Sequence, residues 1–280
     1  MKSRLQNLFD KYNLSPKKFW GQNFLIESKP LSEIIQAANI KSTDNVLEVG
    51  PGLGFLTQKL LSRAKKVVAV EIDPGLHFVL KKELKNKENF TLLKADILEM
   101  DFAALSKNFV GQPYKIVANL PYQITAHFLK KYLSAGYHPD QMTLMVQREV
   151  AQRILAQAGR HSLLSLSVQF YCQPAWVAAV PAAAFFPKPK VDSAIIKLDK
   201  IQQIKMPVDE KLFFRMLKMA FSSKRKQLQN NLAAGLHCSK ENIKKILSAD
   251  NFGLKIRAQE IDLPDWLKIY NKLTAAGLLK

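Results

Sequence analysis

The chain alternates short apolar runs with segments whose apolar residues recur every three or four positions. Residues 46–49, 67–73 and 90–95 have the length and the Val, Ile and Leu content typical of buried strands. Residues 31–38 and 55–61 have helical spacing instead. Strands that alternate with helices in this way predict an α/β fold.

The second half of the chain changes character. Residues 144–146 and 194–198 look like late strands of the same sheet, whereas the pattern beyond about residue 206 is wholly helical, with helix starts at Ser239 and Asp262. We therefore expect three parts, in chain order: a basic, aromatic arm, an α/β domain and a small all-helical domain. Their limits are 1–28, 29–200 and 206–280. The arm is either a docked lid or a disordered tail, and the apolar pair Phe24 and Leu25 favours docking.

The amino-acid composition limits the kinds of partner and compartment that we expect for the chain. With 280 residues, of which 48% are hydrophobic, the chain can bury a full core. Lys and Arg number 42 against 23 Asp and Glu, a net charge of +19, which indicates a polyanion such as nucleic acid; a merely soluble basic surface is the alternative. Cys172 and Cys238 lack metal-site spacing, so we predict no metal and a reducing compartment. We expect no membrane span and a cytoplasmic location, with an organellar one left open.

A glycine turn, Gly-Pro-Gly-Leu-Gly at residues 50–54, follows the first strand and precedes a helix. Such a turn lets the backbone approach a nucleotide-like ligand, but Phe55 replaces the last glycine of a dinucleotide fingerprint. Glu71, at the end of the second strand, can bind ribose hydroxyls, and Asp96, after the third, can accept from an adenine amino group or cap a helix. Together these residues predict an adenosine compound without a pyrophosphate, S-adenosylmethionine.

The tetrapeptide Asn119-Leu120-Pro121-Tyr122 follows the apolar run 115–118. The Asn119 side-chain oxygen and the Leu120 carbonyl, fixed by the proline, can accept from the two N–H bonds of an exocyclic amine and so free its lone pair. The Tyr122 ring offers a face for an unstacked base. The tetrapeptide therefore predicts a site for methylating an amino group, and a turn that merely closes a strand is the alternative.

Motif by motif, the chain resembles the KsgA/Dim1 family of rRNA adenine dimethyltransferases, which is similar in its catalytic domain to the Erm antibiotic-resistance methyltransferases. The resemblance implies a Rossmann-like class I methyltransferase sheet with helices on both faces over the α/β domain. It covers nearly the whole length. The motifs that carry it lie at residues 21–25, 48–54, 71–73, 95–98, 119–122, 145–154 and 186–193.

The resemblance also implies roles for individual residues. Those expected at the cofactor are Asn23, Leu25, Gly50, Glu71, Asp96 and Asn119. Phe186 would wall the base pocket, with simple packing as the alternative. Lys224, Arg225 and Lys226 would bind phosphates of the RNA, with a solvated charged face as the alternative. Gln123 and residues 159–164 depart from the family pattern.

The implied activity is dimethylation of the 6-amino groups of two adjacent adenosines near the 3′ end of small-subunit rRNA. The donor would be S-adenosylmethionine, the product S-adenosylhomocysteine, and the partner a small ribosomal subunit late in assembly. The protein would act as a monomer. Two alternatives stay open: an Erm-type methyltransferase of large-subunit rRNA, and a non-catalytic RNA-binding assembly or transcription factor. The basic helical tail favours the KsgA-like activity, and the intact tetrapeptide and acids argue against a non-catalytic factor.

Overall fold

The computed structural model describes residues 1–202, 207–249 and 252–280. The chain divides into two compact units, Met1–Ala151 with Tyr171–Gln203, and Gln152–Phe170 with Ile204–Lys280. The boundary expected at 206 lies outside the described residues. Residues 152–170, expected in the α/β domain, belong to the second unit. Tertiary contacts explain this placement, because Phe170 stacks on Phe213 at 5.2 Å and His161 Nε2 lies 2.9 Å from Asp262 Oδ1.

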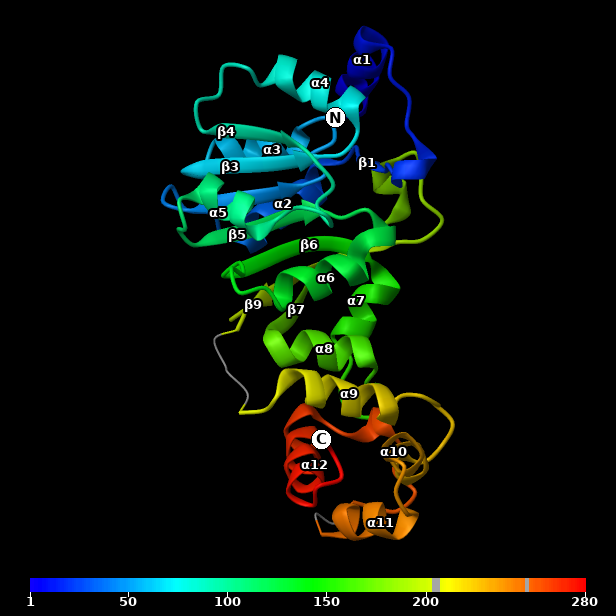
Figure 1. Ribbon diagram of the computed structural model, residues 1–280. Coiled ribbons are helices and arrows are strands. Elements are labelled where there is room, and N and C mark those ends of the chain that lie inside the picture. The colour runs from blue at the N-terminus through cyan, green and yellow to red at the C-terminus, as the bar shows by residue number, and fades with distance from the viewer. Residues whose placement is uncertain (203–206, 250–251) are drawn as a thin grey trace. The chain divides into compact units, whose positions relative to one another are not determined.

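The first unit is built on a seven-stranded sheet with the order β4-β3-β2-β5-β6-β9-β7 (Figure 1). The strands from β4 to β6 in this order are parallel, and β9 runs antiparallel to both β6 and β7. The expected strands and the α/β class are therefore confirmed. The bounds in chain order are β2 (Asn45–Val49), β3 (Lys66–Glu71), β4 (Phe90–Lys94), β5 (Tyr114–Asn119), β6 (Gln141–Gln147), β7 (Gln173–Val180) and β9 (Ser193–Asp199).

The parallel register determines where a ligand can bind. Val49 of β2 pairs with Val70 of β3 and with Ala118 of β5, so the carboxyl ends of these three strands lie at one edge. The chain builds outward from β2 to β3 and β4 on one side, then returns to add β5 and β6 on the other. In such sheets ligands bind outside the strand ends where the order reverses, which here is between β2 and β5.

Helices cover both faces of the sheet (Figure 1). The helices α2, α3 and α4 share one apolar cluster, which includes Ile34, Leu60 and Leu80. The helices α5 and α6 pack on each other, with the rings of Phe102 and Tyr132 5.2 Å apart. The bounds are α2 (Ser28–Ala38), α3 (Phe55–Leu61), α4 (Pro74–Glu83), α5 (Phe102–Phe109), α6 (Thr125–Leu133) and α7 (Arg148–Ile154), with the short helices η2 (Tyr122–Ile124) and η3 (Ala182–Ala184).

The N-terminal arm is docked. Its helix α1 (Lys2–Tyr12) buries Leu5, Leu8 and Phe9 in a cluster with Phe24 and residues of α4. The arm continues through η1 (Lys18–Trp20) to β1 (Phe24–Leu25), which pairs antiparallel with β8 (Phe185–Phe186). An amphipathic helix with its apolar stripe buried in this way is part of the folded unit.

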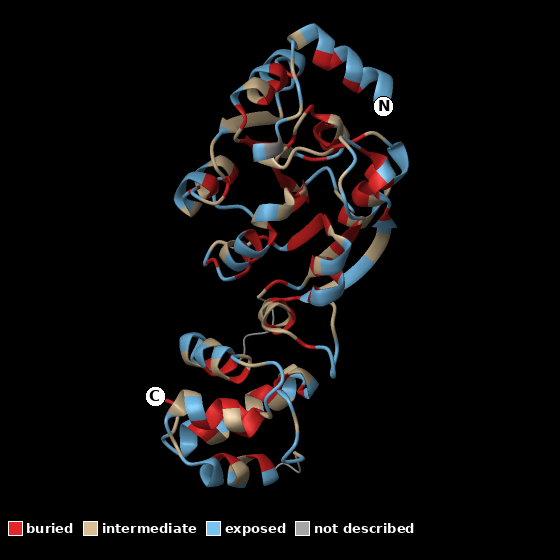
Figure 2. Ribbon diagram, turned by 90° about the vertical axis from the view of Figure 1, so that its right-hand side faces the viewer, coloured by how far each residue is buried: buried red, intermediate tan, exposed pale blue. Residues whose placement is uncertain are grey.

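The described part of the second unit is helical. Trp266, Phe213 and Leu232 are fully buried at its centre, and in Figure 2 the exposed positions lie on the outer sides of the helices. Ser239 caps α11 as expected, its Oγ accepting from Asn242 N at 3.3 Å. The bounds are α8 (Leu163–Tyr171), α9 (Glu210–Ala220), α10 (Leu228–Leu236), α11 (Lys240–Ser248), η4 (Ala258–Glu260) and α12 (Leu263–Ala275). Across the described residues of both units, no helix combines the length and apolar character that crossing a bilayer requires.

Candidate active site

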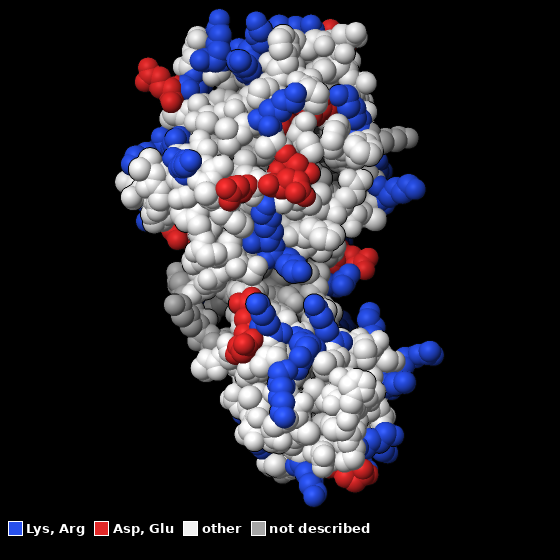
Figure 3. All heavy atoms as spheres, viewed as in Figure 1, with Lys and Arg blue, Asp and Glu red and all other residues white. Residues whose placement is uncertain are grey.

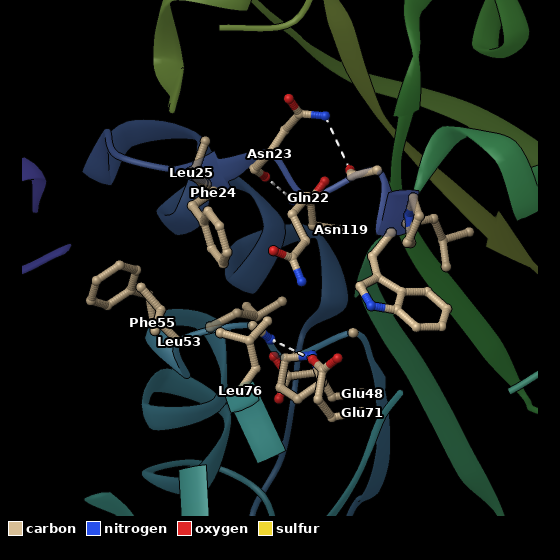
Figure 4. A pocket seen from close by; sticks show the side chains of 18 of the residues that line it. Gln22, Asn23, Phe24, Leu25, Glu48, Leu53, Phe55, Glu71, Leu76 and Asn119 are labelled. Carbon is tan, nitrogen blue, oxygen red and sulfur yellow. Dashed lines mark hydrogen bonds between the residues drawn. The ribbon is translucent and has the colours of Figure 1, made fainter. Parts of the chain in front are cut away.

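A cavity of about 120 Å³ lies at the carboxyl ends of β2, β3 and β5. Three segments far apart in sequence line it, namely the arm, the glycine turn and the tetrapeptide (Figure 4). Figure 4 shows Asn23 and Asn119 on one side of this cavity and Glu48 and Glu71 on another. The structure therefore brings together eight of the predicted site residues: Asn23, Leu25, Gly50, Glu71, Asn119, Leu120, Pro121 and Tyr122.

The glycine turn has a backbone that other residues adopt at a cost. Gly50, Gly52 and Gly54 have φ of 63°, 61° and 79°. At Gly52 a Cβ would also lie 3.3 Å from the ring of Phe24. The arm therefore approaches the turn closely, and this approach forms one wall of the cavity.

Glu71 ends β3 with its side chain buried and oriented by two backbone amides. Gly52 N donates to Oε2 at 3.1 Å, and Asp73 N donates to Oε1 at 2.9 Å. Burial raises the pKa of Glu71 to about 7, against the effect of these two donors. The carboxyl group is thus held rigidly at the cavity, and its charge changes near neutral pH.

Glu48 is a cavity residue that the sequence analysis did not single out. Its side chain is 1% exposed, lines the cavity, and has no hydrogen-bond partner for Oε2. Burial raises the pKa of Glu48 to about 8. The sequence feature that could have identified Glu48 is its place as the one acidic residue in the apolar strand before the glycine turn. An unpaired carboxyl group is seldom buried unless it has a function.

The buried Glu48 carboxyl predicts a pH-dependent stability. Its pKa is raised from 4.5 to about 8 by folding, so between these values the folded protein keeps a proton that the unfolded chain has lost. Stability from this group therefore falls as the pH rises. We expect Glu48→Gln to gain stability relative to the parent protein, by at most ~1.4 kcal/mol per pH unit in this range. Urea unfolding at several pH values measures the difference, and parallel profiles for the two proteins would contradict the prediction.

The tetrapeptide is held in place from three directions. Asn119 Nδ2 donates to Asn23 O at 3.3 Å, and because a carbonyl only accepts, this contact fixes which way the amide faces. Leu120 N donates to Met145 O at 3.1 Å, which extends the pairing of β5 with β6. The Tyr122 hydroxyl lies 2.7 Å from Ser193 Oγ. Asn119 Nδ2 is therefore engaged with the arm, and Oδ1 is the other polar atom of this amide.

Ser193 contacts the tetrapeptide through Tyr122, which the sequence did not reveal. It is fully buried in β9, and burial also raises the pKa of the Tyr122 phenol above its ordinary value. We expect Ser193→Ala and Tyr122→Phe to lower the methylation rate by similar factors, and the double variant to lose no more than either single one. Single-turnover assays of the three variants measure this, and additive losses would exclude a role for the hydrogen bond.

A second cavity, of about 190 Å³, adjoins the first, and Trp20, Gly50, Ile72 and Pro121 line both. Asp96 lines this second cavity, where its Oδ1 accepts from Leu98 N at 2.8 Å. The acid heads a turn, and the following helix α5 begins only at Phe102. Asp96 therefore fits a contact with a ligand at the cavity better than it fits a helix cap.

The remaining predicted residues lie elsewhere. Phe186 pairs with Phe24, and its ring lies 6.3 Å from that of Phe9. It is 37% exposed, and its role in a base pocket stays a prediction. Lys224, Arg225 and Lys226 are exposed in the turn between α9 and α10. In the parts of the chain that the structure describes, no three His, Cys, Asp or Glu side chains gather as a metal site would require.

Comparison with known sequences decides the family. The family described as "Ribosomal RNA adenine dimethylase" matches residues 13–274. The chain belongs to this family. It is similar to "Ribosomal RNA small subunit methyltransferase A" of Dehalococcoides mccartyi, with 42% identity over 95% of this chain and 91% of that protein. The protein of the same name from Clostridium acetobutylicum is 38% identical over 96% of this chain and 97% of its own length.

Solved structures of family members and relatives support the fold. A dimethyladenosine transferase from Plasmodium falciparum is 30% identical, with a TM-score of 0.76, over 91% of this chain and 98% of that one. The 23S rRNA methyltransferase ErmE is 26% identical, with a TM-score of 0.72, over 90% of this chain and all of that one. The Rossmann-like methyltransferase fold expected of this adenine dimethylase family member is thus confirmed.

Proposed function

We propose that this family member dimethylates the 6-amino groups of two adjacent adenosines near the 3′ end of small-subunit rRNA, with S-adenosylmethionine as the donor. One observation carries the proposal: Asn119-Leu120-Pro121-Tyr122 lines the same cavity as the glycine turn and Glu71. A methyl donor and an amine acceptor can thus meet between them. The names of the relatives from Dehalococcoides and Clostridium support the choice of small-subunit rRNA.

The residues present fit the donor. In the second cavity, Asp96 and Ile72 would hold the adenine, and in the first, Glu71 would accept from the ribose hydroxyls. The glycine turn leaves room for the methionine part, and the unpartnered Glu48 Oε2 offers an acceptor deep in the first cavity. Two connected cavities with an acid in each suit an elongated ligand with an adenosine at one end. When bound, the donor supplies an electrophilic methyl group.

Catalysis rests on placing the amine. Asn119 Oδ1 accepts from one N–H bond and the Leu120 carbonyl from the other, which draws the nitrogen toward sp³ geometry. The amide orientation and the Leu120 peptide are fixed before the substrate arrives, so no reorganisation is needed during transfer. Tyr122, anchored on Ser193, presents its ring to the base. A general base need not act first, because the proton becomes acidic only after the nitrogen has gained the methyl group.

The cellular setting follows as part of the proposal. We place the protein in the cytoplasm, as a monomer, on the small subunit late in assembly. The net charge of +19 suits an RNA partner. In the face shown in Figure 3, Lys and Arg side chains are spread over each unit. Lys224, Arg225 and Lys226, in the described part of the region 206–280, would supply phosphate contacts.

Incubation with labelled donor tests the proposed function directly. The protein is mixed with small subunits that lack the modification, or with large subunits, and the label is then located by mass spectrometry of RNA digests. We expect two dimethyladenosines close to the 3′ end of the small-subunit RNA. Label in large-subunit RNA would favour an ErmE-like activity, which the structural similarity to ErmE keeps as the second candidate. Binding of RNA without label would favour a non-catalytic factor.

The basic turn yields a further prediction. Neutralising Lys224, Arg225 and Lys226 together should flatten the dependence of RNA affinity on salt concentration, by roughly 0.7 in logarithmic slope for each RNA phosphate that the variant no longer neutralises. Filter binding at several salt concentrations measures the slope. Lys240, Lys244 and Lys245 of α11 provide a matched control of equal charge in the same unit. If the first triple variant keeps the parental slope, the turn is only a solvated charged face.

A further inference from the structure

Asp73 is a buried carboxylate with more partners than its local role requires. It is the N-cap of α4, where its Oδ1 accepts from Gly75 N at 2.8 Å. The same oxygen forms an ion pair with Lys17 Nζ at 2.9 Å, and Oδ2 accepts from Gln22 Nε2 at 2.8 Å. The Asp73 side chain is 2% exposed. Two of its three partners therefore come from the arm, more than fifty positions away in sequence.

The two arm residues are also tied to each other. Lys17 N donates to Gln22 Oε1 at 2.8 Å, so the Gln22 amide bridges the start of the segment 17–22 and the carboxylate. Together with Asp73, these residues close a small loop of the arm. We call the three side chains, Lys17, Gln22 and Asp73, the arm clamp.

The segment held by the arm clamp forms a wall of the cavity. Residues 20–25 all line it, and the carbonyl of Asn23 accepts the amide of Asn119 at 3.3 Å. On the opposite side, the backbone N–H of Asp73 orients Glu71. Asp73 therefore supports two parts of the site. Its backbone N–H orients Glu71, and its side chain holds the arm segment that faces the tetrapeptide.

We propose that Asp73 is a positioning residue for the methyl donor, acting through Lys17 and Gln22 to hold the arm closed over the cofactor cavity. This inference rests on the proposed function, since it concerns the same donor site. The rest of the arm is anchored separately, because α1 is buried on α4 and Glu83 accepts from Lys11 Nζ and Tyr12 Oη at 2.8 and 2.7 Å. Loss of the arm clamp therefore loosens the segment 17–23 and leaves α1 docked and β1 paired with β8.

Calorimetric titration with S-adenosylhomocysteine tests the proposal. We expect Lys17→Met and Gln22→Met each to weaken binding by roughly 5- to 20-fold, at or below the low end of the roughly 10- to 150-fold range for a hydrogen bond to a charged group because both side chains act on the donor indirectly, and the pair together to lose less than the product. At saturating donor, the turnover rate should recover toward the parental rate, because bound donor favours the closed segment in which Asn23 O still holds the Asn119 amide. Lys17→Arg, which keeps the charge, should restore most of the affinity.

Two control variants separate the arm clamp from general effects. Glu83→Gln removes the charge from another polar contact of the arm, at α1, and should leave donor affinity unchanged. Asp101→Asn alters the N-cap of α5, which has the same geometry as that of α4 without contact to the arm segment, and should also have no effect. Parental affinity in both Lys17→Met and Gln22→Met would overturn the inference. Failure of the parent protein itself to bind the ligand would instead overturn the proposed function.

Discussion

Replacing Asn119 with alanine is expected to lower the methyl-transfer rate by at least ~10²–10³-fold, the cost of deleting one preorganised hydrogen-bond partner that acts on developing charge. The Asn119 amide faces Asn23 O at 3.3 Å, so the alanine variant loses the fixed acceptor, Oδ1, that would hold the target amine. RNA affinity should stay nearly intact, because the proposed phosphate contacts of Lys224, Arg225 and Lys226 lie outside the cavity.

The measurement must separate chemistry from donor binding. Asn119 lines the donor cavity and supports the arm, so part of its effect will appear as weaker donor binding. Single-turnover assays at saturating donor isolate the transfer step. Ser193→Ala is a useful comparison because it disturbs the same loop at Tyr122 without removing the acceptor. If the Asn119→Ala protein still methylated at the parental rate, the proposed role of Asn119 would be wrong. The tetrapeptide would then be only a turn that closes β5.

Replacing Glu71 with alanine should weaken donor binding by ~1.5–3 kcal/mol, or roughly 10- to 150-fold in affinity, the range for hydrogen bonds to a charged group. The carboxyl group is held by Gly52 N and Asp73 N, so its remaining acceptor capacity is aimed without rearrangement. Glu71→Gln keeps one acceptor oxygen and is the gentler control for folding. Unchanged affinity in both variants, measured by calorimetry, would refute the assignment of Glu71 to the ribose.

If Glu71 binds the ribose, its titration should also make the affinity for the donor depend on pH. Burial raises its pKa to about 7 in the free protein, and ribose hydroxyls donate better to the ionised form. Donor binding therefore favours loss of the proton, and affinity should rise as the pH increases through about 7 and fall below it. Glu71→Gln should flatten this dependence. A profile as steep in the variant as in the parent would assign the titration to another group, with Glu48 the first to test.

The sequence alone predicted the features that depend on local patterns. The apolar runs predicted β2, β3 and β4, because strands of a parallel sheet covered by helices on both faces are rich in apolar residues. The glycine turn and the tetrapeptide were recognised from short motifs, since their backbone geometry is determined by Gly and Pro at fixed positions. The same motifs indicated the family, which the match over residues 13–274 confirmed.

Only the tertiary structure decided which distant groups meet. Nothing local in the sequence joins Asp73 to Lys17 and Gln22, or Tyr122 to Ser193, and residues 152–170 entered the second unit through contacts with distant helices. Tertiary packing also decided which groups are buried. The raised pKa values of Glu48 and Glu71 come from desolvation by their packed neighbours. The chemistry of each side chain is encoded at one position, whereas its partners and its exposure to water depend on how the whole chain packs.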